Sequence, residues 1–352
     1  MTSKLSRLKS YPFEKLNQLI GQVEPRKNLR NIDFSIGEPK HSPPSFILDQ
    51  VSGAIQEMSR YPKIGGSDRL RDSIKKWLLK RYKLPIDSLD SNQNIAPVAG
   101  TREGLFSLTQ AIIGDSSSKD PVVLTQNPTY QIYEGAAEMA NAEVFYFSTN
   151  KQSQNLPYLK SINDEILQRT KIMYLCSPGN PSGKVIPETV IADAIKLAID
   201  FEFLLVSDEC YSEIYMDESK PPPGLLEICN KVGNENYKNC LVFHSLSKRS
   251  NLPGFRSGFA AGDAKIIQKY KRYRTYHGCS IPEPIQYASS YAWSDETHCI
   301  SNRVMYRKKL EEVGKILGKY LTYPKPEASF YLWPKHPSTA KHLPMSYLDS
   351  KM

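Results

Sequence analysis

Short apolar runs alternate with amphipathic stretches along the chain, and this alternation predicts the order of strands and helices. The apolar runs that we interpret as strands are residues 122–125, 144–147, 172–176, 203–206 and 241–243. Helical patterns fall between these runs, as expected when strands and helices alternate. The sequence therefore predicts an α/β fold, and it contains no internal repeat or low-complexity segment.

Apolar residues at intervals of three and four positions predict two amphipathic helices. In residues 67–82 these are Leu70, Ile74, Trp77 and Leu78, and in residues 101–113 they are Leu105, Leu108 and Ile112. The second helix follows Gly100, and we expect it to end at Gly114, as a helix with a glycine C-cap would. The proline-rich residues 221–224 are expected to form a surface loop.

Length and charge narrow the class of protein only a little. A chain of 352 residues accommodates one large domain and a smaller one, and its net charge is +9. The densest basic run, residues 269–274, falls in a helical pattern, and we interpret it as a solvated helix face. The alternative is a field that attracts an acidic small molecule. Nucleic-acid binding is not expected, because no binding motif accompanies the charge.

The cysteines and the N-terminus indicate a cytoplasmic protein. The six cysteines are Cys176, Cys210, Cys229, Cys240, Cys279 and Cys299. They are not at metal-ligand spacing, so we expect free thiols in a reducing compartment and no metal site. The first residues lack the apolar core of a signal peptide, and no apolar run is long enough to cross a membrane.

Polar segments follow three of the predicted strands, and together they indicate one site. Residues 177–183 follow the first strand, Ser207 and Asp208 the second, and residues 244–256 the third. In open α/β sheets, ligands bind beyond the carboxyl ends of the strands. Each segment alone has an ordinary explanation, since aspartates cap helices and Ser-Pro-Gly-Asn-Pro runs form turns. Their order along the chain is what makes them specific.

These motifs resemble those of the fold-type I aminotransferases of class I/II. The resemblance extends from residues 35–39 to residues 330–333. It implies a large domain with a mostly parallel seven-stranded sheet between helices, and a smaller α+β domain. We accordingly expect an N-terminal arm with part of the small domain at residues 1–45, the large cofactor domain at 46–285, and an incomplete small domain at 286–352.

The resemblance implies pyridoxal 5′-phosphate as the cofactor. Lys248 would hold it as a Schiff base and then act as the general base, which requires a pKa well below about 10.4. Asp208 would pair with the protonated pyridine nitrogen, the alternative being a capping residue. Asn180 and Tyr211 would hydrogen-bond the phenolic oxygen, and Asn180 would also contact the substrate. Tyr130 would stack on the ring, the alternative being a core tyrosine.

The same resemblance assigns a phosphate site and a dimer. Ser245 would supply a hydroxyl and Arg256 a bidentate guanidinium. Thr101 and Arg102 would open a helix whose backbone amides point at the anion, with the Arg102 side chain free to face solvent. Tyr61 would reach the phosphate of a neighbouring subunit, which implies a homodimer with shared sites.

Several segments resemble a narrower group, the N-succinyldiaminopimelate aminotransferases. They are residues 11–16, 35–41, 131–136, 207–215, 245–251 and 273–278. This implies that glutamate and N-succinyl-2-amino-6-oxopimelate are converted to 2-oxoglutarate and N-succinyl-LL-diaminopimelate, in diaminopimelate and lysine biosynthesis. Gly37 would lie in a loop over the substrate carboxylate, the alternative being a simple turn glycine.

The C-terminal part departs from the family pattern. The family continues well beyond the match at residues 330–333 and there contains an arginine for the substrate carboxylate, whereas the last arginine here is Arg307. Lys335 and Lys341 are point charges rather than forks. Residues 343–348 resemble a later piece of the family, so we expect a truncated chain with impaired activity, unless another residue or the partner subunit supplies the clamp. The alternative functions are an aminotransferase for another amino acid, a β-elimination lyase and a non-catalytic cofactor-binding protein.

Overall fold

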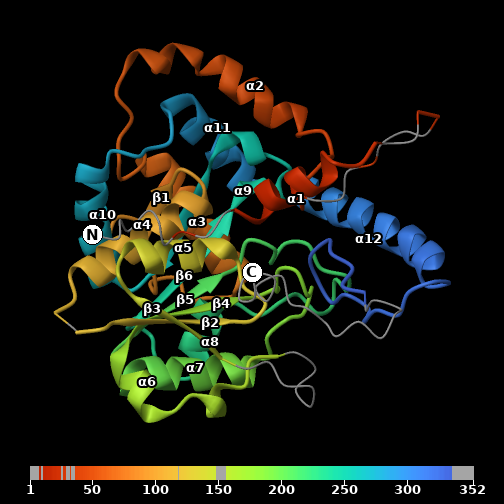
Figure 1. Cartoon of the computed structure of the whole chain (residues 1–352). Helices are drawn as coiled ribbons and strands as arrows, with labels where there is room; N and C mark the ends of the chain where they lie inside the picture. Colours follow the sequence, from red (N-terminus) through yellow and green to blue (C-terminus); the bar gives the residue numbers. More distant parts are fainter. Residues whose placement is uncertain are drawn as a thin grey trace.

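The apolar runs of the sequence form a seven-stranded β-sheet (Figure 1). The computed structural model describes residues 8, 11–24, 27–28, 32, 36–117, 119–147 and 156–334. The strands are β1 (Ile95–Val98), β2 (Val122–Gln126), β3 (Glu143–Phe147), β4 (Thr170–Cys176), β5 (Leu204–Asp208), β6 (Cys240–Ser245) and β7 (Gly258–Gly262). Their order across the sheet is β1-β7-β6-β5-β4-β2-β3. All five predicted strands are confirmed, with no end shifted by more than two residues.

The sheet is mostly parallel, as predicted. Strands β2 to β6 pair in parallel, whereas β7 runs antiparallel to both β6 and β1. Consequently β1 runs in the same direction as β6, and the carboxyl ends of six strands meet at one edge. Strands β1 and β7 escaped prediction because alanine, glycine and proline make up much of both.

Helices cover both faces of this sheet (Figure 1). They are α1 (Pro12–Ile20), α2 (Ser45–Gly53), α3 (Asp68–Arg81), α4 (Thr101–Gly114), α5 (Gln131–Met139), α6 (Asp164–Arg169), α7 (Glu188–Asp200), α8 (Leu225–Lys231), α9 (Leu246–Arg249), α10 (Ala264–His277), α11 (Glu283–Ser294) and α12 (Thr297–Leu317). In the described part of the chain, no helix is both long and apolar enough to span a bilayer.

Two buried clusters lie on opposite faces of the sheet, because successive strand residues point in opposite directions. In β4, Met173 packs into the cluster that includes residues of α7 and α8. Its neighbour Tyr174 packs into the other cluster, with residues of α4, α5 and α10. A sheet covered on both faces reads as nearly continuous apolar runs, which is why the sequence revealed its central strands.

The predicted helix at residues 67–82 is confirmed as α3, and the next helix ends at Gly114 as predicted, but without a glycine cap. The N-cap of α3 is Ser67, whose hydroxyl accepts from the amide of Leu70 at 3.4 Å. Gly114 is the last residue of α4, and the C-cap is Asp115, which keeps right-handed backbone angles. No left-handed residue is needed there, so Gly114 does not act as a C-cap.

The loop at residues 221–224 is less exposed than predicted. Pro222 and Gly224 are buried, because the Tyr82 ring packs against Gly224 and Arg81 donates to the carbonyl of Pro222 at 3.2 Å. The loop therefore seals the end of α3 against the start of α8.

The basic run on α10 is only partly a solvated face. Lys269 and Arg272 are exposed, but Arg274 is 1% exposed and its guanidinium lies 2.5 Å from the carboxylate of Glu103 on α4. Tyr270 is buried beside it. The interpretation as a solvated face is thus wrong for Tyr270 and Arg274, which fasten α10 to α4.

The division into domains at residues 45 and 285 stays a prediction. Helix α11 packs against α2 and α3, and α12 runs from its end along the side of the molecule (Figure 1). Lys335, Lys341 and residues 343–348, on which the expected C-terminal departure depends, lie outside the described residues. All six cysteines are free thiols, as predicted.

Candidate functional site

The polar segments predicted to converge do meet at one edge of the sheet. The register pairs Cys176 with Asp208 across β4 and β5, and Ser245 with Gly258 across β6 and β7. Gly258 also pairs with Val98, the last residue of β1, just before Gly100. The strand ends thus bring residues that are far apart in sequence to one line.

Lys248 lies one turn beyond the end of β6, on the short helix α9. The Ser245 hydroxyl caps this helix by accepting from the amide of Ser247 at 3.1 Å. The Lys248 amine donates to the carbonyl of Gly37 at 2.6 Å. It also lies 5.7 Å from the ring centroid of Tyr211 and 5.3 Å from that of Phe330. The amine therefore lies between the rings of Tyr211 and Phe330 and the N-terminal segment.

The surroundings of Lys248 favour its neutral form. Burial lowers the pKa of the amine to about 8, against the opposing effects of Cys210 and Glu38 and with some help from Arg102 and Arg256. An unperturbed lysine has a pKa near 10.4, so the neutral fraction at pH 8 is about a hundredfold larger here. Such an amine can attack a carbonyl or accept a proton near physiological pH.

Asp208 ends β5 as a buried carboxylate without a matching cation. Its side chain accepts from the hydroxyl of Tyr133 at 2.8 Å and from the amide of Cys210 at 3.2 Å. Burial, with Asp208 nearby, raises the pKa of the Tyr133 hydroxyl well above its usual value, which keeps it a donor. Within the described residues, Asp208 forms no ion pair. A buried carboxylate held only by neutral donors is suited to a cationic ligand.

Tyr211 follows Asp208 by three residues, and Asn180 lies in the loop after β4, the strand that pairs with β5. The Tyr211 hydroxyl is 2.7 Å from that of Tyr331, and a side chain at Gly37 would collide with the same Tyr331 hydroxyl. Burial, with Tyr331 nearby, raises the pKa of Tyr211 well above its usual value. Asn180 is partly exposed in the loop after β4.

The predicted phosphate ligands cluster around Gly100. Gly100 has φ +85°, and a β-carbon there would occupy the position of the Arg256 guanidinium. Arg256 itself adopts left-handed angles, with φ +50°, and donates to the carbonyl of Pro253 at 3.0 Å. Thr101 opens α4, and its hydroxyl lies 3.2 Å from the Cys210 thiol. Ser245 belongs to the same group, because it pairs with Gly258, which in turn pairs with Val98, two residues before Gly100.

Arg102 and Tyr130 form a second pair beside this cluster. The Arg102 side chain is exposed, as expected, and donates to the hydroxyls of Tyr130 at 3.0 Å and Tyr11 at 3.2 Å. Burial raises the pKa of Tyr130 to about 12, although Arg102 lowers it. The adjoining cavity of about 390 Å³ is lined by Ala99, Arg102, Glu103, Phe106, Ile132, Arg256 and His277.

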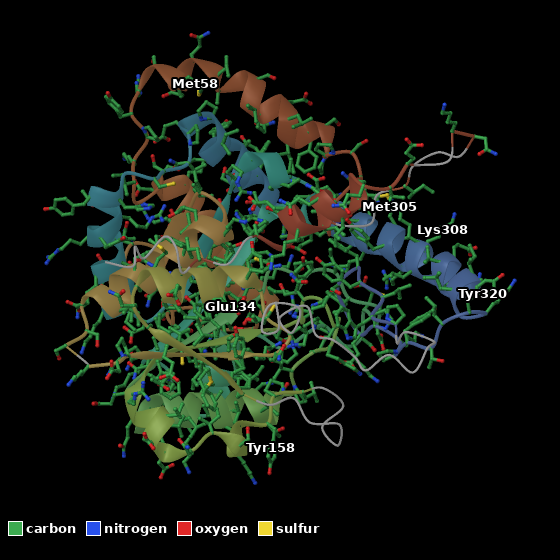
Figure 2. The ribbon with its side chains drawn as sticks, in the orientation of Figure 1. Met58, Glu134, Tyr158, Met305, Lys308 and Tyr320 are labelled. Carbon is green, nitrogen blue, oxygen red and sulfur yellow. The ribbon has the colours of Figure 1, made fainter. Side chains whose placement is uncertain are left out.

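Tyr61 is a predicted site residue whose side chain a single chain leaves fully in solvent, away from the other site residues. It is fully exposed, just after the short helical turn of residues 55–59. Met58 on that turn is 62% exposed and points away from the molecule (Figure 2). The other predicted residues lie at the sheet edge or over it.

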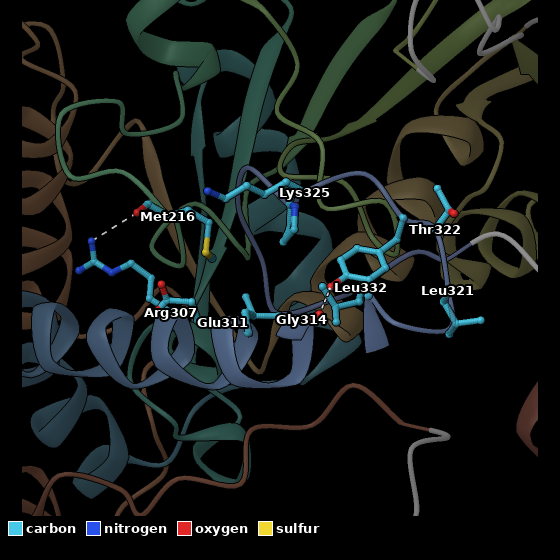
Figure 3. Close-up of a pocket in the computed structure, with 12 residues that line it drawn as sticks. Met216, Arg307, Glu311, Gly314, Leu321, Thr322, Lys325 and Leu332 are labelled. Carbon is cyan, nitrogen blue, oxygen red and sulfur yellow. Dashed lines mark hydrogen bonds between the residues drawn. The ribbon is translucent and has the colours of Figure 1, made fainter. Parts of the chain in front are cut away.

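A larger cavity, of about 640 Å³, lies apart from these residues (Figure 3). It separates α12 from residues 321–332, with Met216, Leu310 and Tyr323 among its walls. No predicted site residue lines it.

Sequence reasoning gave no role to Tyr133, Tyr331 and Phe330. Tyr133 follows Tyr130 by one helical turn, a spacing that brings both toward the same side. Phe330 and Tyr331 lie at the C-terminal end of the family resemblance. The hydrogen bond of Tyr133 to Asp208 spans 75 residues of chain and that of Tyr331 to Tyr211 spans 120, so local sequence patterns do not reveal these roles.

Comparisons with known proteins agree on one family. The profile of the family described as aminotransferase class I and II matches residues 30–348. An LL-diaminopimelate aminotransferase from Dehalococcoides mccartyi is 30% identical over 340 residues, covering 95% of this chain and 83% of its own. An aminotransferase structure from Neisseria meningitidis Z2491 superposes with a TM-score of 0.89 at 39% identity, covering 96% and 84%. Aminotransferase AspB from Helicobacter pylori 26695 gives 0.85 at 37%, covering 93% and 83%.

Proposed function

This chain belongs to the class I and II aminotransferases, which depend on pyridoxal phosphate, and we propose that its acceptor is N-succinyl-2-amino-6-oxopimelate with glutamate as the amino donor. The observation that carries the amino-transfer chemistry is the buried Lys248 amine of lowered pKa, at the same strand edge as the uncompensated carboxylate of Asp208. The succinylated acceptor is supported by the sequence motifs.

The residues at the strand edge fit the cofactor. When bound, pyridoxal phosphate supplies an electron sink for negative charge at the substrate α-carbon. Asp208 would place its buried negative charge against the pyridine nitrogen. Tyr211 and Asn180 would donate to the phenolic oxygen, and Tyr130 would cover one face of the ring. In this arrangement the Asp208 carboxylate would gain a cationic partner, which lowers the free-energy cost of burying its charge.

The phosphate would occupy the group around Gly100. The free amides of Thr101 and Arg102 begin α4, and such amides attract anions. Arg256 supplies a guanidinium that can bind two phosphate oxygens, and Ser245 supplies a hydroxyl. Because Gly100 carries no side chain, Arg256 can approach this helix end closely.

Lys248 would carry the cofactor and move the proton of the substrate. Its neutral amine can accept a proton at the α-carbon and return it one position away. The Gly37 carbonyl orients the amine, since the two are already 2.6 Å apart. Gly37 would also lie beside the substrate carboxylate, where Tyr331 limits the space.

A homodimer would complete the site. Tyr61 is fully exposed in one chain, and a partner's phosphate offers its hydroxyl a role that nothing in its own chain does. Dimers are typical of this family. The cytoplasmic location remains a prediction from the sequence.

Half-reactions with single substrates test the proposed function. The loaded enzyme should convert glutamate to 2-oxoglutarate. It should likewise convert N-succinyl-LL-diaminopimelate to the corresponding oxo acid. We expect kcat/KM for the succinylated compound to exceed that for LL-diaminopimelate by about tenfold or more. Ammonia and pyruvate from a cysteine-type substrate would instead indicate a lyase. A protein that binds the cofactor and reacts with no amino acid would be non-catalytic.

LL-diaminopimelate itself is the second candidate substrate. It is favoured by the name of the relative from Dehalococcoides mccartyi, which is 30% identical. The same assay separates the two, because a preference for LL-diaminopimelate over its succinylated form reverses the expected ratio.

Replacing Gly100 with alanine should weaken cofactor binding by about tenfold or more. The β-carbon would displace the Arg256 guanidinium, and a charge-assisted hydrogen bond contributes about 1.5–3 kcal/mol. Gly233→Ala is the matched control, since Gly233 has φ +79° but open space around its missing side chain. Both variants place alanine at a positive φ, so the difference in cofactor affinity between them, measured by absorbance titration, tests the contact with Arg256. Equal affinities would contradict the placement.

A further inference from the structure

The N-terminal segment before α2 lies across Lys248. We call residues 36–44 the strap. The carbonyl of Gly37 accepts from the Lys248 amine at 2.6 Å, and Pro39 is buried. Such a carbonyl can orient the amine only if other contacts hold the strap in place.

His41 is the strap residue that contacts α12. Its ring lies 4.4 Å from that of Tyr306, centroid to centroid, and its Nδ1 is 3.0 Å from Oδ1 of Asn302. Tyr306 in turn stacks on Phe330, whose ring centroid is 5.3 Å from the Lys248 amine. The strap thus contacts α12, and α12 packs through Tyr306 against Phe330, the ring that lies near the Lys248 amine.

Asn302 joins the strap to the backbone of Lys248. Its amide nitrogen donates to the carbonyls of Lys248 at 3.2 Å and Arg249 at 3.3 Å. Its oxygen accepts from the side chain of Asn251 at 2.9 Å and from His41. Asn302 is 2% exposed, so these bonds form away from competing water. Since its oxygen can only accept, Nδ1 of His41 must be the donor, which defines the chemistry that a replacement has to reproduce.

We propose that His41 and Asn302 are positioning residues that latch the strap over Lys248. Through Asn302 the latch holds the backbone of the lysine, and through Gly37 it holds the amine at the other end of the same side chain. The proposal rests on the role proposed for Lys248. It adds that residues far from the sheet edge set the orientation and the burial of that amine.

Three substitutions at His41 separate the possible contributions of this side chain. His41→Ala removes both the donor and the ring, His41→Phe keeps a ring against Tyr306, and His41→Asn keeps an N–H near the position of Nδ1. His41 is partly exposed, so the fold should tolerate each change. Ser42→Ala is a control on the same strap, because the Ser42 side chain is exposed to solvent.

Two measurements on the cofactor-free full chain test the latch. Hydrogen exchange of the peptide spanning residues 36–44 should be about tenfold faster in His41→Ala and in His41→Phe. The pH midpoint for acetylation of Lys248, read by peptide mass spectrometry, should rise by about one unit in both as the amine becomes hydrated. His41→Asn should restore wild-type values, and Ser42→Ala should not change them.

Loss of activity in the loaded enzyme should follow the same order of variants. Wild-type exchange and midpoint in His41→Ala would overturn the latch, and wild-type behaviour of His41→Phe would overturn the role of the N–H. Neither measurement uses a substrate. Failure of the proposed substrate would therefore leave these results unchanged, and a failed latch would leave the substrate assay intact.

Discussion

Replacing Lys248 with alanine is expected to lower the rate of amino transfer at least ~10⁴-fold, with little change in stability. The variant loses both the nitrogen that would carry the cofactor and the base that would move the proton, and general-base catalysis alone contributes ~10²–10⁴-fold. Among the described residues, the hydrogen bond that the amine loses is the one to the carbonyl of Gly37. The measurements are kcat/KM with glutamate and the melting temperature of each protein.

Lys271 offers a matched control for this substitution. Burial lowers its pKa to about 8 as well, and its amine donates to the carbonyl of Asn92 at 2.6 Å, outside the candidate site. Lys271→Ala should therefore retain activity. Borohydride reduction of the loaded wild-type enzyme should leave the pyridoxyl group on the peptide that contains Lys248. Recovery of that group on another lysine would rule out the proposed role of Lys248.

The residues predicted from sequence are those fixed by strand ends. Asp208 and Ser245 end strands and Lys248 follows one closely, so their positions depend on apolar runs that a sheet covered on both faces makes easy to recognise. The convergence of these segments needed only the rule that ligands bind at the carboxyl edge of such a sheet.

The residues that escaped prediction depend on contacts between distant parts of the chain. Tyr133 is a helix residue whose importance lies in a hydrogen bond to Asp208, 75 positions away. The contact of Gly37 with Lys248 spans 211 positions. Arg274 looks like a surface charge until Glu103 is placed beside it. Hydrophobic periodicity predicts which side of a helix or strand is buried, but it does not predict which polar side chain of another element it contacts.

A buried cluster of charged side chains next to the candidate site contributes to the stability of the fold. Glu213 follows Tyr211 by two residues and is fully surrounded by protein. Arg81 on α3 donates to it at 2.7 Å, and Arg303 on α12 lies 3.7 Å away. This carboxylate thereby neutralises the nearly buried Arg81, and it is a second partner for Arg303, which also pairs with Glu218 at 3.0 Å.

Replacing Glu213 with alanine is expected to lower the free energy of unfolding at pH 7 by about 3–5 kcal/mol, because the buried Arg81 loses its carboxylate partner and Arg303 keeps only Glu218. Glu312→Ala is the control, since loss of its exposed ion pair with Lys315 at 2.9 Å should leave the free energy of unfolding nearly unchanged. Urea unfolding followed by circular dichroism measures both. A loss below 1 kcal/mol for Glu213→Ala would mean that water or a rearranged side chain satisfies the arginines.

The pH dependence of this difference has a definite sign. Burial alone would raise the pKa of Glu213, but the charges of Arg81, Arg249 and Arg303 and the hydrogen bond from Arg81 outweigh it, and the pKa is lowered. A carboxyl group whose pKa is lower in the folded state stabilises the protein above its unfolded pKa, near 4.3. That contribution disappears as the pH falls through the folded value. The gap between wild type and Glu213→Ala should therefore be constant from pH 8 to 5 and narrow below about pH 4, whereas a gap that widens on acidification would require a raised pKa and a different partner for Glu213.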